Sequence, residues 1–166
     1  MKRFRVLGWG LSLAAACLIA QGAAADGLAR VKKDGALYHY AGQVQLSGSY
    51  DYSRDENAMS AVGDQFCFSP DKGSARKIPR ERGDDRDRWF CFENDKQART
   101  MLEVDKLLKD KRVCSLRGKA TIEVDHYIAD LTDGTEANDT ARLLRVVRLA
   151  PAKTTPFVKD TQHCRE

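Results

Sequence analysis

The sequence predicts a mainly β domain, a small five-stranded barrel with one helix between its third and fourth strands and two disulfides. Three observations predict this fold class. Alternating apolar and polar residues mark two long strands, two short aromatic segments lie between them, and four cysteines follow an N-terminal leader. We expect one domain over residues 42–166, preceded by an N-terminal extension at 26–41.

Residues 1–25 have the pattern of a secretory signal peptide, which is removed from the mature protein. An apolar run over 6–20 follows the charged start, and three alanines at 23–25 offer a cleavage site before Asp26. The charged start consists of Lys2, Arg3 and Arg5. We therefore expect a periplasmic or secreted protein. Lipoprotein anchoring through Cys17 is an alternative, because residues 13–17 resemble a lipobox, with alanine at position 14 where a large aliphatic residue is usual.

The leader also accounts for most of the net positive charge. The chain has 28 Lys and Arg against 24 Asp and Glu, and three of the bases lie in the leader, which leaves 25 against 24. A nearly neutral domain without aromatic residues interleaved in a basic stripe does not favour nucleic-acid binding. The apolar segments after the leader are too short for a transmembrane helix, which needs about 20 residues. We expect neither a nucleic-acid partner nor a transmembrane segment, and the sequence does not predict an oligomeric state.

The first strand is predicted over 44–52, where apolar and polar residues alternate. The residues of the inward phase are Val44, Leu46, Gly48, Tyr50 and Tyr52. Gly48 permits a bulge or a sharp bend. Tyr50 and Tyr52 lie at the end of the strand, where we expect them to be more exposed than the other aromatic residues.

Two short aromatic segments, 66–68 and 89–92, are predicted to form the second and third strands. In each, the cysteine points opposite to its flanking phenylalanines, so strands paired in register would bring Cys67 close to Cys91. Four cysteines allow three pairings. The register favours Cys67–Cys91 and leaves Cys114–Cys164, which would fasten the C-terminus to the fourth strand. A metal site or a catalytic thiol is the alternative use, but the chain has no C-x-x-C motif.

The helix is predicted over 94–108. Asn94 is a suitable N-cap, and Gln97 three residues later completes a capping box. Its apolar side consists of Ala98, Met101, Leu102 and Leu108. Lys106, Lys109, Lys111 and Arg112 near the C-terminal end suit the helix dipole.

The fourth strand is predicted over 114–128, where every second residue shares one face, with Gly118 as the place to bend. The members of this face are Cys114, Leu116, Gly118, Ala120, Ile122, Val124, His126 and Ile128. The segment 141–149 also fits a helical stripe, through Leu143, Val146, Val147 and Ala150. Two adjacent β-branched residues and the fold order favour a fifth strand there.

The order of three strands, a helix and two strands is that of the OB-fold, a five-stranded Greek-key barrel. Residues 42–149 resemble the small exported OB-fold proteins of Gram-negative bacteria in this order, in Leu46-Ser47-Gly48 and in Leu116-Arg117-Gly118-Lys119-Ala120. The resemblance implies a curled OB-fold-like barrel and carries over no functional residues. A sandwich or another small β-rich fold is the alternative.

A long charged loop at 71–88 is the predicted partner-binding region, because binding groups often lie on loops that project from a rigid scaffold. The candidate binding residues are Arg76, Lys77, Arg80, Arg82, Arg86 and Arg88, with Tyr50 and Tyr52 on the adjacent strand. The alternative is a solvated loop whose mixed charges satisfy one another.

Neither metal binding nor catalysis has a clear motif. Acidic residues lie around Gly134, but their spacing does not match an EF-hand, so a solvated turn is favoured over a calcium site. They are Asp130, Asp133, Glu136 and Asp139. His39, His126 and His163 have no nucleophile in a recognisable setting, and Asp125-His126 is the one seed for an enzyme. We expect no catalytic residues, cofactor or metal.

The sequence favours an exported, non-catalytic binding protein of the bacterial cell envelope, whose partner is a protein or an envelope glycan. One alternative is a periplasmic inhibitor or immunity protein that plugs an envelope-targeting enzyme with the 71–88 loop. Another is an OB-fold protein of the envelope stress response.

Overall fold

The computed structural model describes residues 27–55, 65–132, 138–158 and Cys164. The predicted signal peptide, Cys17 and His163 lie outside the described residues. The strands are β1 (Ala29–Asp34), β2 (Leu37–Ser53), β3 (Cys67–Pro70), β4 (Phe90–Phe92), β5 (Val113–Asp130), β6 (Thr140–Leu149) and β7 (Lys153–Pro156). The helices are α2 (Lys72–Ala75), α3 (Asp95–Met101) and α4 (Val104–Leu107). The prediction of a mainly β domain is confirmed.

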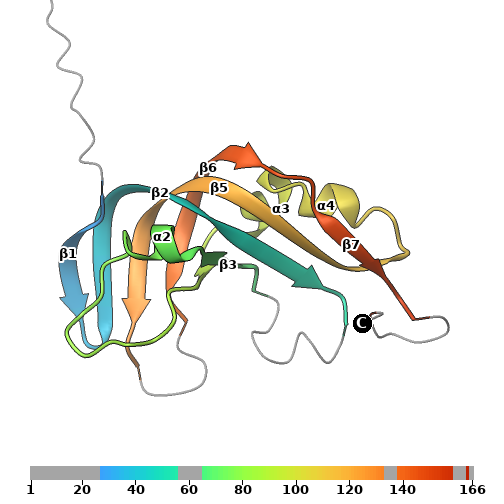
Figure 1. The fold of residues 1–166 in the computed structure, drawn as a ribbon. Coiled ribbons are helices and arrows are strands. Elements are labelled where there is room, and N and C mark those ends of the chain that lie inside the picture. Colours follow the sequence, from blue (N-terminus) through green and yellow to red (C-terminus); the bar gives the residue numbers. More distant parts are fainter. Residues whose placement is uncertain (1–26, 56–64, 133–137, 159–163, 165–166) are drawn as a thin grey trace, which may run out of the picture.

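One sheet contains all seven strands, and the two long strands β2 and β5 are its centre (Figure 1). β2 pairs antiparallel with both β3 and β5, β3 pairs with β4, β4 pairs parallel with β6, and β6 pairs antiparallel with β5. These pairings form a ring of five strands. Outside this ring, β1 pairs antiparallel with β2, and β7 pairs antiparallel with β5. Within the predicted extension at 26–41, the described residues 27–41 contribute β1 and the start of β2.

β5 confirms the predicted alternation from Cys114 to Val124, but the prediction that His126 and Ile128 point inward is wrong. His126 has a left-handed backbone with φ 54°, and the pairing with β6 shifts register between Asp125 and Ile128. Such a bulge moves the following side chains to the other face. Tyr127 and Ala129 are therefore buried, and the His126 side chain is 62% exposed.

The prediction of one helix over 94–108 is also wrong. α3 and α4 are separate, because Glu103 between them has φ 59°. Asn94 occupies the N-cap position of α3, but its side chain makes no capping bond. It instead exchanges two hydrogen bonds of 2.9 Å with the backbone of Leu143 on β6. The sharp turn at Glu103 allows both Leu102 and Val104 to be fully buried.

Aromatic side chains fill the centre of the core. Phe66 and Phe92 have ring centroids 5.4 Å apart, and Phe68 and Phe90 have centroids 5.8 Å apart. Tyr50, which we expected to be more exposed than the other aromatic residues, is 1% exposed, and its hydroxyl donates a hydrogen bond to the carbonyl of Leu102. Its ring covers Gly118, where a Cβ atom would overlap the ring atoms.

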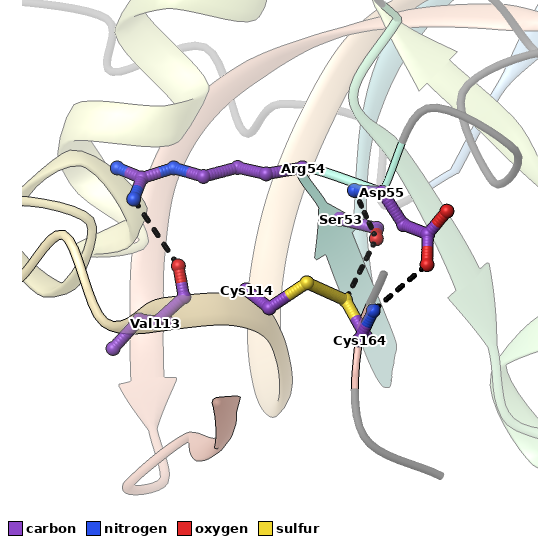
Figure 2. Close-up of a disulfide and its surroundings, with 6 residues drawn as sticks. All are labelled: Ser53, Arg54, Asp55, Val113, Cys114 and Cys164. Atoms are coloured by element: carbon purple, nitrogen blue, oxygen red, sulfur yellow. Dashed lines mark hydrogen bonds between the residues drawn. A yellow bond between two sulfur atoms is a disulfide. The ribbon is translucent and has the colours of Figure 1, made fainter. Parts of the chain in front are cut away.

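Both favoured disulfides are present. Cys67 and Cys91 are direct partners in the β3–β4 pairing, as the register predicted. Cys114 and Cys164 join the start of β5 to the C-terminal segment across 50 residues of sequence. In Figure 2 the Cys164 amide donates to the Asp55 carboxylate, at 2.9 Å, and Ser53 lies beside the Cys164 sulfur. Loop-closure entropy predicts that the two bonds stabilise the fold by roughly 3.5 and 4 kcal/mol.

Two disulfides fit a protein that functions outside the cytosol, because cytosolic thiols are kept reduced. Among the described residues, every helix falls short of the length and apolar character needed to span a bilayer.

Candidate functional site

The 71–88 loop, the predicted binding region, packs against the sheet. Its first residues form α2, which lies against β2 and β3 (Figure 1), and Asp71 caps this helix by accepting the amide of Ser74 at 2.8 Å. Farther along, Ile78 is buried in the core. Glu81 accepts hydrogen bonds from Arg30 on β1 and from Tyr40 on β2. The loop is therefore part of the fold from its first residue through Glu81.

The charged centre of the loop is a buried ion network. Arg80 Nη1 lies 2.5 Å from Asp139 Oδ2, and the two side chains are 6% and 3% exposed. Arg86 donates to Asp84 at 2.9 Å and to Asp139 at 3.1 Å. The hydroxyl of Tyr127 accepts a hydrogen bond from Arg80 and also bonds to Asp139. The expectation that Asp139 belongs to a solvated turn is wrong, because this carboxylate is buried and balances two arginines.

The electrostatics of the network agree with this geometry. Hydrogen bonds from Arg86, together with the charge of Arg80, hold the pKa of Asp84 below its ordinary value. Burial, followed by the charge of Asp139, raises the pKa of Tyr127 well above its ordinary value. The charges of Arg80 and Arg86 are thus neutralised by Asp84 and Asp139 within the molecule. This pairing argues against these two arginines as contacts for a partner.

The other predicted binding residues are dispersed. Arg76 and Arg82 are exposed. Lys77 donates a hydrogen bond of 3.0 Å to the carbonyl of Gln45 on β2. Arg88 is partly buried, and its Nε atom has no hydrogen-bond partner among the residues that the structure describes. Tyr52 is half-buried beneath the guanidinium of Arg99, which lies 5.6 Å from the ring centroid. The structure does not bring these residues together into one site.

A hollow of about 410 Å³ opens where β2, β3, β5 and the end of β6 meet. β3 approaches β2 so closely here that a Cβ atom on Gly48 would overlap the backbone of Ser69 and Pro70. Asp71, the first residue of the charged loop, forms part of the lining. The hollow therefore combines the sheet face with the beginning of the predicted binding loop.

Hydroxyl groups and two cations line the hollow. The hydroxyl-bearing residues are Ser47, Ser49, Ser69 and Thr121, and the cations are Lys119 and Arg148. The hydroxyls of Ser47 and Thr121 bond to each other at 2.9 Å. Across the described ranges, no carboxylate forms an ion pair with Lys119 or Arg148. A concave surface lined by hydroxyl groups and by the positive charges of Lys119 and Arg148 is suited to a polar ligand that carries negative charge.

The neighbouring charges on the same face are paired across strands. Asp125 lies opposite Arg142 and accepts two hydrogen bonds from it, at 2.9 and 2.8 Å. Glu123 lies opposite Arg145 and accepts at 2.6 Å. In the next pair of this series, Thr121 lies opposite Arg148. We call these three pairs the β5–β6 charge ladder; its last pair has a hydroxyl in place of the carboxylate.

Sequence reasoning missed this site because of bulges in β6. The arginines of the ladder are three residues apart, and on a regular strand that spacing points side chains to alternate faces. Leu144 and Val147 are bulge residues that have no pairing partner on β5. Each interval of three residues between the arginines therefore spans only two residues of β5, and the three arginines face the same side of the sheet. The outward position of Lys119 on its strand was the one available signal.

The described residues contain little that suggests catalysis or a metal. The His126 imidazole lies 3.7 Å from the Glu93 carboxylate, and neither His126 nor His39 bonds to a described serine or cysteine side chain. Asp55, Cys114 and Cys164 place one ligand atom each within 4.8 Å of one another. The two cysteines form a disulfide, so neither offers the thiolate that a metal requires.

Comparisons with family models, curated proteins and solved structures found no match to this chain. We therefore infer the function from the geometry of the hollow and of the charged residues around it.

Proposed function

We propose that this chain is an exported, non-catalytic binding protein of the bacterial cell envelope, and that the hollow between β2, β3, β5 and β6 binds an envelope glycan. The observation that carries this proposal is the lining of the hollow, where hydroxyls, one carboxylate and two cations surround a small concave surface. Sugars are recognised by such sets of hydrogen-bonding groups. The predicted leader and the two disulfides support export.

We further propose that the ring of strands is an OB-fold. The order β2, β3, β4, β6, β5, with α3 and α4 inserted between β4 and β5, supports this assignment. The inhibitor hypothesis has less support, since it used the charged loop as a plug. The charges of Arg80, Asp84 and Arg86 in that loop are neutralised within the molecule.

The test uses protein purified from the periplasm of an export-competent host. We expect its first residue to be Asp26 and the protein to be retained on immobilised glycan fractions from a Gram-negative envelope. Passage through every glycan fraction, combined with capture of one specific envelope protein, would contradict the glycan proposal and favour a protein partner.

A further inference from the structure

Within the described part of the chain, Lys119 and Arg148 in the hollow have no carboxylate partner, and we infer that they bind an anionic group on a sugar, either a carboxylate or a phosphate. The inference rests on the proposed function, because it names the chemical class of the glycan. It goes further in giving separate roles to the two sides of the hollow.

The charge ladder leaves the positive charge of Arg148 without a facing carboxylate on β5. Opposite charges that face each other across strands stabilise a sheet, and two of the three arginines have such a partner. Arg148 faces Thr121, whose hydroxyl is already bonded to Ser47. The positive charge at this end of the ladder is therefore not cancelled by the described part of the chain, and it is available to a ligand.

Lys119 adds a second positive charge to the lining of the hollow. Lys119 lies two residues before Thr121 on β5, and its carbonyl accepts the amide of Ala150 at 2.9 Å. Lys119 and Arg148 thus line the same side of the hollow, from adjacent strands. A planar guanidinium forms paired hydrogen bonds with a carboxylate or phosphate, and an ammonium adds a compact charge.

The opposite side of the hollow suits the uncharged part of a sugar. Asp71 accepts the backbone amide of Ser74, which holds the pKa of this carboxyl below its ordinary value, so it is ionised at neutral pH. A carboxylate accepts hydrogen bonds from sugar hydroxyls, and the cross-strand partners Ser49 and Ser69 also line the hollow. The described residues that line the hollow include no aromatic ring, so we expect charge and hydrogen bonds to supply the affinity and salt to weaken it.

Calorimetric titration with defined sugars tests the inference. The probes are a galacturonate tetrasaccharide, its methyl ester, which lacks the charge, and glucose 6-phosphate. We expect the acid to bind about tenfold more tightly than the ester. The variants Lys119→Gln and Arg148→Gln should each weaken binding of the acid by about tenfold. Arg82→Gln is the matched control, because it removes one exposed positive charge from the 71–88 loop.

The outcomes separate this inference from the proposed function. Equal binding of acid and ester, unaffected by Arg148→Gln, would overturn the inference and leave glycan binding intact. Equal losses in Arg82→Gln and Arg148→Gln would overturn the assignment to the hollow. Failure to bind every probe and every envelope glycan would overturn both. Tighter binding of the phosphate probe would identify a sugar phosphate, and tighter binding of the galacturonate would identify a uronic acid.

Discussion

Thr121 lies directly opposite Arg148 across β5 and β6, at the position where the two other pairs of the charge ladder have a carboxylate opposite an arginine. This arrangement separates two roles of arginine on one face. Arg142 and Arg145 bond to partners within the sheet, and Arg148 lines the hollow. The proposed binding of an anionic sugar depends on this difference between the three arginines.

A glutamate at position 121 should complete the charge ladder. We expect Thr121→Glu to pair with Arg148 and to weaken galacturonate binding by about tenfold, because the internal carboxylate competes with the ligand. The thermal midpoint should stay close to that of the native protein. Thr121→Val, which removes the hydroxyl without adding charge, is the control and should bind the acid more tightly than Thr121→Glu.

Gly118 should not tolerate a side chain. A Cβ atom there would overlap the ring of Tyr50, and this ring cannot move away easily because it is buried and its hydroxyl is bonded to Leu102. We expect Gly118→Ala to lower the free energy of unfolding in urea by about 1–3 kcal/mol. Gly73→Ala in α2 is the control. The new Cβ would make ordinary contact there, so stability should hold or rise by up to about 1 kcal/mol.

Asp139 should be the most sensitive residue of the ion network. Its carboxylate balances Arg80 and Arg86 and also accepts the amide of Asp130 at 3.0 Å. Asp139→Asn leaves buried positive charge without full compensation, which should cost about 3 kcal/mol in chemical unfolding. Asp110→Asn at the exposed pair with Arg112 should have no measurable effect. Similar results for the two variants would contradict the internal role of the network.

Alkaline pH should destabilise the fold through Tyr40. Burial and a hydrogen bond to Glu81 raise the pKa of Tyr40 to about 12, from an ordinary value of 10.0. The unfolded chain therefore loses this proton at lower pH than the folded chain. The stabilisation is complete below pH 10 and is lost as the pH rises toward 12. Urea midpoints at pH 9 and pH 11.5 should differ less in Tyr40→Phe than in the native protein, and an identical difference would refute this role.

Regular alternation made part of the fold predictable. The apolar phases of β2 and most of β5 gave two long strands, and the opposed phases of cysteine and phenylalanine gave the Cys67–Cys91 pairing. β1 was not predictable, because all its residues are exposed and it has no apolar phase. Irregular backbone caused the errors. The left-handed residue Glu103 divides the predicted helix into α3 and α4. The left-handed residue His126 reverses which side chains of β5 point into the core.

The site was less predictable than the fold, because it depends on contacts between distant segments. The loop at 71–88 was identified by its charge, but the burial of Arg80 and its pairing with Asp139 depend on where the 138–140 segment lies. The alignment of Arg148 with Thr121 similarly depends on two bulges in β6 that the sequence does not signal.

The most direct test of the central claim is a nitrogen–proton NMR titration of the exported protein with the galacturonate tetrasaccharide. We expect the amide signals of Ser49, Lys119, Thr121 and Arg148 to shift together and saturate with a single affinity, with the amides of Arg76 and Arg82 unchanged. Shifts confined to the 71–88 loop, or no shift at the four residues of the hollow, would contradict the account.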